Sequence, residues 1–135
     1  MTARGKARKR ALDVLYEADL RGVAAIDVLE SRHETLEAPM NPYTETLVHG
    51  VIDHWDRIDD LLSTYAEGWS LDRMPAIDRN LLRIGTWELL WGEVPEGVAI
   101  SEAVDLARSL STEESGTFVN GLLARILQIK PTLSL

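Results

Sequence analysis

The stretch that most constrains the fold is the run from Val98 to Ile129, which has the pattern of two consecutive amphipathic helices. Between Ala99 and Leu110, a wheel of 100° per residue gathers the apolar side chains on one arc. After a short acidic turn, a second apolar arc begins at Phe118. Gly121 falls on the polar face of that second helix, where glycine costs roughly 1 kcal/mol relative to alanine. Such a glycine is typical of close backbone approach, although a neutral exposed position is the alternative.

The turn between these two helices carries more than one signal for a helix start. Ser111 to Glu114 has the S-x-x-E form of a capping box, and Ser115 offers a second N-cap. Either serine would accept a hydrogen bond from a free N–H group of the first turn. The sequence therefore predicts that the last helix begins within this turn.

Helical periodicity also covers the earlier part of the chain, and no useful length alternates with the period of two that a strand requires. We predict a first helix from Thr2 to Arg21, which Gly22 ends, and a weaker second helix from about Ala24 to Leu36. A short helical turn is expected after Ser70.

The segment from Asn41 to Gly68 predicts one long helix. Asn41 and Pro42 form an N-cap followed by proline at the first helical position. No proline interrupts the apolar arc that follows. The segment from Ile77 to Trp91 is apolar around most of its circumference, which indicates the central helix of a bundle. The predicted fold is all-α, a compact bundle of about seven helices in a single domain over residues 1–135.

Charge is unevenly distributed along the chain. The net charge is −8, yet the first ten positions contain no acid and hold five of the 14 basic residues: Arg4, Lys6, Arg8, Lys9 and Arg10. Such a basic N-terminal arm is consistent with a solubilising tail, a nonspecific polyanion binder or a specific RNA-binding segment. Tyr16 follows shortly after and favours RNA, because single-stranded RNA stacks on aromatic rings beside phosphate-binding cations. A place at the edge of the core is the alternative for Tyr16, and the pattern alone favours an ordinary core position for Phe118.

Evidence for catalysis or metal binding is thin. The sequence contains no glycine-rich phosphate loop, nucleophile elbow or metalloprotease motif. His49 and His54 are five residues apart, which is the wrong spacing for two ligands on one helical face. The chain has no cysteine, which fits a reducing compartment, and no apolar run approaches the roughly 18 residues needed to span a bilayer. We therefore expect a protein that is not an enzyme and has no metal site.

Glu88 falls inside the apolar arc of the central helix. A buried carboxylate needs a partner, either an arginine or the N–H groups of a helix start. We expect a structural ion pair that joins two helices, in preference to a general acid or base.

Four blocks of the sequence, in this order and spacing, resemble the NusB family of transcription antitermination proteins. They are ARKRALDVLYEADL, NPYTETLVHGVIDHWDRIDDLL, LDRMPAIDRNLLRIGTWELL and VAISEAVDLARSLSTEESGTFVNGLL. The tetrad from Phe118 to Gly121 and the Glu-Glu-Ser turn before it are the most specific part. The resemblance covers nearly the whole chain.

This resemblance implies a cytoplasmic, cofactor-free fold of two small helical subdomains. It also implies binding to the boxA sequence of ribosomal RNA operon leaders together with NusE, a small ribosomal-subunit protein, within the RNA polymerase antitermination complex. Some members form homodimers that hide the RNA surface. The resemblance assigns RNA binding to these positions: Arg4, Lys6, Arg8, Lys9, Arg10, Tyr16, Glu114, Ser115 and Phe118.

For Glu114, the resemblance implies an acidic residue that limits RNA affinity by repulsion. Gly5 and Lys6 lie where relatives often carry further arginines. The NusE surface is expected between Trp69 and Arg83, with Trp69, Arg79 and Arg83 as candidates. A function of another class remains open, namely a helical protein–protein adaptor whose basic tail is incidental.

Overall fold

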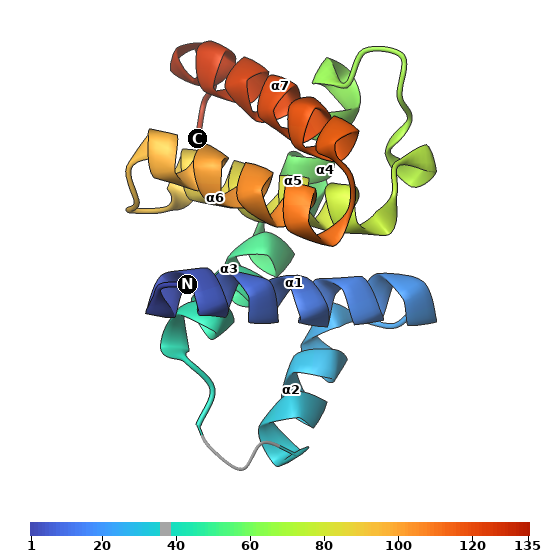
Figure 1. Cartoon of the computed structure of the whole chain (residues 1–135), viewed down its shortest axis with the longest axis vertical. Coiled ribbons are helices and arrows are strands. Elements are labelled where there is room, and N and C mark those ends of the chain that lie inside the picture. Colours follow the sequence, from blue (N-terminus) through green and yellow to red (C-terminus); the bar gives the residue numbers. More distant parts are fainter. Residues whose placement is uncertain (36–38) are drawn as a thin grey trace.

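The computed structural model describes residues 1–35 and 39–135, and the regular secondary structure in these ranges is all helical (Figure 1). This confirms the predicted fold class, an all-α bundle of about seven helices. Two short 3₁₀ turns, η1 and η2, accompany the α-helices. The elements in chain order are α1 (Ala3–Arg21), α2 (Ala25–Thr35), α3 (Pro42–Asp53), α4 (Trp55–Tyr65), η1 (Leu71–Arg73), α5 (Ala76–Trp91), α6 (Glu96–Leu110), α7 (Glu113–Ile129) and η2 (Lys130–Thr132).

The helices form two groups that share α5. Helices α1, α2 and α3 pack against one another, while α4 to α7 form the second group, which lies above them in Figure 1. Helix α5 also packs against α1 and α3, and every residue from Asn80 to Leu90 is buried. Its expected central position is therefore confirmed, and the side chains on this helix connect both groups.

The residues that flank α1, Thr2 and Gly22, are of types that typically begin and end a helix. The Thr2 hydroxyl accepts a hydrogen bond from the N–H of Gly5 and so caps the first turn. Gly22 adopts a left-handed conformation with φ of 66°, which a residue without a Cβ tolerates. Helix α2 ends at Thr35 within the described residues, and its predicted end at Leu36 lies outside them.

The prediction of one helix from Asn41 to Gly68 is wrong, because the chain breaks at His54. The φ and ψ angles of His54 are −116° and 20°, outside the helical range, and its ring stacks on Trp91 with centroids 3.9 Å apart. Helix α3 packs against α1, α2 and α5, whereas α4 packs against α5 and α7. The chain therefore changes direction where it passes from one helical group to the other.

The residue that caps the start of α7 is neither of the two predicted serines, Ser111 and Ser115. Its N-cap is Thr112, whose hydroxyl accepts a hydrogen bond from the N–H of Ser115 at 3.0 Å. Ser111 and Ser115 instead bond to each other through their hydroxyls at 2.8 Å. The helix starts within the predicted turn, and the distance of three residues from cap to bonded N–H is the usual one.

Candidate nucleic-acid interface

The basic N-terminal segment is the beginning of a packed helix and does not form a separate arm. Gly5, Ala7 and Arg8 are buried within the first two turns of α1. The Thr44 hydroxyl donates a hydrogen bond to the carbonyl of Ala7 at 3.1 Å and ties this segment to α3. Removing residues 1–10 would therefore remove part of the core together with the positive charge.

Arg8 is the ion-pair partner that Glu88 was expected to need. Its Nε donates to Oε1 of Glu88 at 2.8 Å and its Nη2 donates to Oε2 at 3.0 Å. The Tyr43 hydroxyl also donates to Glu88. Arg8 is only 2% exposed and Glu88 only 1%, so this pair joins α1 to α5 in the interior. The prediction of a buried, paired Glu88 is confirmed, and the placement of Arg8 on an RNA-facing surface is wrong.

The surroundings of Arg8 and of Tyr43 in this cluster raise the pKa of both side chains. Burial works against the charge of Arg8, but the hydrogen bonds and negative charge of Glu88 outweigh it and raise the pKa of the guanidinium. Burial, followed by the hydrogen bond to Glu88, raises the pKa of the Tyr43 hydroxyl well above its ordinary value of 10.0. Tyr43 therefore remains a neutral donor.

The other basic residues of this segment lie at the surface. The guanidinium of Arg4 lies 4.8 Å from the centroid of the Tyr43 ring, and Lys9 pairs with Asp13 at 2.9 Å. Lys6 and Arg10 are exposed, and neither forms an ion pair within the described part of the chain. These four cations remain available to phosphate groups, and three of them, Arg4, Lys6 and Arg10, have no acidic partner among the described residues.

The two parts of the predicted RNA surface, the basic start of α1 and the start of α7, lie apart in the molecule. Helix α1 packs on α2, α3 and α5, and α7 packs on α4, α5 and α6. Figure 1 shows the N-terminus toward one side and the connection from α6 to α7 toward the other. Tyr16 is half-buried and lies farther along α1 than the basic turns. An RNA that reaches both parts must therefore cross the molecule.

The start of α7 forms one wall of a hollow of about 590 Å³. The half-buried ring of Phe118 lies 5.9 Å from that of Trp69, inclined by 55°, and Trp69 is 53% exposed. Glu114 lies at the surface and lines the hollow, whereas Ser115 is buried with its hydroxyl engaged within the turn. A base can stack on these aromatic rings, and the free N–H groups of the helix N-terminus suit a phosphate.

Asp78 is a residue of this hollow that the sequence analysis did not single out. It is 3% exposed, and its Oδ1 has no hydrogen-bond partner among the described residues. Burial raises the pKa of this carboxyl above its ordinary value of 3.8, against a smaller opposing effect of Ser115. Its position in the first turn of α5 resembles that of an ordinary helix-start acid, so no pattern in the sequence reveals its burial.

Two of the three candidates for a protein-partner surface are engaged inside the protein. Arg79 pairs with Asp19 at 2.8 Å and donates to the carbonyls of Leu71 and Met74. Arg83 binds both carboxylate oxygens of Asp59, at 2.9 and 3.0 Å. Arg79 and Arg83, predicted as candidates for the partner surface, are thus held by internal ion pairs, and Trp69 alone of the three is exposed.

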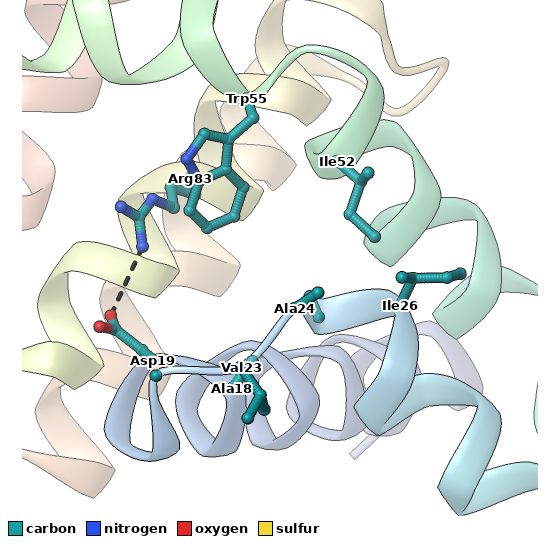
Figure 2. A pocket seen from close by; sticks show the side chains of 10 residues that line it. Ala18, Asp19, Val23, Ala24, Ile26, Ile52, Trp55 and Arg83 are labelled. Carbon is teal, nitrogen blue, oxygen red and sulfur yellow. Dashed lines mark hydrogen bonds and ion pairs between the residues drawn. The ribbon is translucent and has the colours of Figure 1, made fainter.

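Arg83 also lies at the edge of an apolar pocket of about 390 Å³ between the two helical groups. Figure 2 shows Ile52 and Trp55 facing the segment from Ala18 to Ala24 across this pocket, with Arg83 and Asp19 at one edge. The guanidinium of Arg83 lies 4.1 Å from the centroid of the Trp55 ring. The pocket thus has an apolar floor and an edge whose charges already neutralise each other.

Two other features, a metal site and a membrane-spanning helix, concern the same described ranges. No group of three or more histidine, cysteine, aspartate or glutamate side chains there is arranged to hold a metal ion. None of the helices in those ranges combines the length and the apolar character required to cross a bilayer.

Comparison with known proteins identifies the family. The model of the NusB family matches residues 5–128. The chain belongs to the NusB family. A curated relative from Arthrobacter sp. (strain FB24), named transcription antitermination protein NusB, is 59% identical over 134 residues, which is 98% of each chain. A relative of the same name from Kineococcus radiotolerans is also 59% identical, over 135 residues and 99% of each chain.

Solved structures of the family have the same fold. NusB of T. maritima superposes with a TM-score of 0.83 at 36% identity, over 94% of this chain and 92% of that one. A second structure, described as antitermination factors NusB and NusE in complex with dsRNA, contains a chain that superposes with a TM-score of 0.81 at 31% identity. The match covers 93% of this chain and 96% of that one. The two helical subdomains are thus a property that this chain shares with its family.

Proposed function

We propose that this protein is a transcription antitermination factor that binds boxA RNA of ribosomal RNA operon leaders together with NusE. It would act in the cytoplasm as a non-catalytic member of the RNA polymerase antitermination complex. The observation that carries this proposal is the identity of 59% over 98% of both chains with a transcription antitermination protein NusB. The solved complex of a NusB relative with NusE and RNA supports the same partners.

The arrangement of side chains supports RNA contacts at two places. The exposed Arg4, Lys6 and Arg10 and the half-buried Lys9 provide positive charge on α1, where they suit phosphate groups. Phe118 and Trp69 provide the ring surfaces on which an unpaired base stacks. In this proposal Arg8 positions the cations of α1 through its bond to Glu88 and makes no contact with RNA.

NusE would bind the segment between Trp69 and Arg83, next to the face of Trp69 and Phe118 on which the RNA base stacks. Arg79 and Arg83 support this surface from within by joining α5 to α1 and α4 through their ion pairs. A homodimer that covers the RNA surface is a separate proposal, which the concentration dependence of the molecular mass would test.

A titration of labelled boxA RNA at several salt concentrations tests the proposal. The double variant Lys6→Gln/Arg10→Gln should bind more weakly, and its salt slope should fall by about 1.4, since each phosphate neutralised on a single strand contributes about 0.7. The control Arg21→Gln/Arg57→Gln removes the same charge from exposed positions elsewhere. It should leave the slope close to that of the unmodified protein.

A duplex of the same sequence separates base stacking from simple charge attraction. Single-stranded boxA RNA should bind more tightly than the duplex, because only unstacked bases can reach Phe118 and Trp69. The absence of RNA binding by the unmodified protein, alone and with NusE, would favour the adaptor function instead.

A further inference from the structure

Three of the four glycines inside α3, α5 and α7 are explained by internal packing. A Cβ at Gly50 would lie 2.3 Å from the Trp87 ring, and one at Gly85 would lie 2.7 Å from Leu123. A Cβ at Gly116 would lie 2.5 Å from the side chain of Arg108. A Cβ at Gly121 would meet no atom of the described residues within 4 Å, although Gly121 lies in the middle of α7. Packing within the protein thus gives no reason for a residue that weakens the helix.

Gly121 lines a groove of about 300 Å³ between α7 and the end of α4. Phe118 lines both this groove and the hollow of about 590 Å³ at the start of α7. The two depressions therefore meet at the ring to which the proposed function assigns base stacking. A ligand that stacks on Phe118 can extend in either direction.

The groove combines an aromatic ring with an exposed cation. The guanidinium of Arg125 lies 5.6 Å from the centroid of the Tyr65 ring and donates to the side-chain oxygen of Gln128 at 3.0 Å. Glu67 is the acidic residue that lines the groove, and Thr117 adds a hydroxyl. A ring and a guanidinium along a groove are the features with which proteins bind single-stranded nucleic acid.

We propose that the RNA strand stacked on Phe118 continues along α7 into this groove, crosses the bare backbone at Gly121 and places a phosphate on Arg125. This inference rests on the proposed RNA-binding function and extends its site. Arg125 follows Phe118 by seven residues, which is about 10 Å along the helix axis. A methyl group at position 121 would hold the strand away from the helix backbone.

Two variants and one matched control test the inference with boxA RNA that carries single-stranded extensions on both sides. Gly121→Ala adds a methyl group in the groove, and Arg125→Gln removes its cation. Gly97→Ala is the control, because Gly97 also lies in a helix, α6, with open space where its Cβ would be. Affinity, its salt dependence and the melting temperature are measured for each protein.

We expect both alanine variants to raise the melting temperature, since alanine favours a helix more than glycine does. Only Gly121→Ala should weaken RNA binding, so that its stability and affinity change in opposite directions. Arg125→Gln should bind roughly tenfold more weakly, as expected for the loss of one charged hydrogen bond, and its salt slope should fall by about 0.7.

Unchanged affinity in both Gly121→Ala and Arg125→Gln would overturn the inference. Equal weakening by Gly97→Ala and Gly121→Ala would also overturn it, because the effect would then not be local to the groove. RNA binding by the unmodified protein in the same titration supports the proposed function independently of either outcome.

Discussion

Helix α5 carries two buried carboxylates, ten residues apart, whose surroundings are opposite. Glu88 accepts two hydrogen bonds from Arg8 and one from Tyr43, so its charge is matched by a cation in the interior. Asp78 is buried to a similar degree, yet its Oδ1 has no partner within the described part of the chain. Its carboxyl lines the hollow next to Phe118 and Trp69.

This difference separates a structural site from a candidate functional one. A buried charge that is paired and hydrogen-bonded holds two helices in one arrangement, whereas an unpaired polar atom costs stability. Such unsatisfied groups concentrate at binding sites, where a ligand completes their contacts. The Glu88 end of α5 therefore fixes the position of α1, and the Asp78 end adjoins the proposed RNA surface.

Loss of the paired carboxylate should have the largest effect. Glu88→Ala leaves Arg8 charged and buried with only the longer ion pair to Glu102, at 3.7 Å, and it should lower the free energy of unfolding by roughly 3 kcal/mol. Glu88→Gln should lower it less, since the amide retains part of the hydrogen bonding. Chemical denaturation measures both variants, and an unchanged stability of the alanine variant would contradict the structural role of the pair.

Removal of the Phe118 ring, which lines the same hollow as Asp78, should change binding more than folding. Phe118→Ala should weaken boxA RNA binding by about 1–3 kcal/mol, the contribution of one stacked base. Because Phe118 is only half-buried, its loss should destabilise the fold by less than the roughly 3–5 kcal/mol of a core phenylalanine. A variant that unfolds while the remaining folded fraction binds RNA normally would assign Phe118 to the core.

The unpaired carboxylate should respond to neutralisation in the opposite sense to Glu88. Because burial raises the pKa of Asp78, the folded state is penalised once pH rises above the ordinary pKa of 3.8. Asp78→Asn should therefore stabilise the protein by about 1 kcal/mol at pH 7, and the gain should vanish below that pKa.

Asp19→Asn is a matched control for this pH dependence. Burial alone would raise the pKa of Asp19, but the hydrogen bond from Arg79 and the other polar contacts outweigh it and lower the pKa. This carboxylate stabilises the fold at neutral pH, and the contribution is lost as pH falls through its lowered pKa. Thermal melts from pH 3 to pH 7 should thus give effects of opposite sign for the two variants.

The smallest effect is expected at Glu114, which lies at the surface of the Asp78 end. Glu114→Gln should tighten RNA binding by less than about 1 kcal/mol, because it removes a negative charge from the approach to the α7 N-terminus. Stability should fall by only a few tenths of a kcal/mol, as the helix loses a favourable first-turn acid. Glu113→Gln, one residue earlier and also exposed, tests whether the effect depends on position.

Local chemistry made most helices predictable. The hydroxyl of Thr2, the proline at position 42 and the glycine at position 22 act within a few residues, so that helix limits follow from neighbouring side chains. The burial of Glu88 was predictable for the same reason, because helical periodicity fixes the direction of each side chain relative to the apolar arc. Its partner was not, since Arg8 is 80 positions away and resembles the exposed cations beside it.

The sequence by itself determined an all-α chain, the face that each helix buries and the presence of a buried carboxylate in α5. Only the tertiary structure decided that the helix expected from Asn41 to Gly68 breaks at His54, that Arg8 lies inside and that Asp78 has no cationic partner among the described residues. Periodicity and capping depend only on side chains that are a few residues apart in the sequence. At the break, the ring of His54 stacks on Trp91 of another helix, and whether each charge is paired depends on helices that meet only when the chain folds.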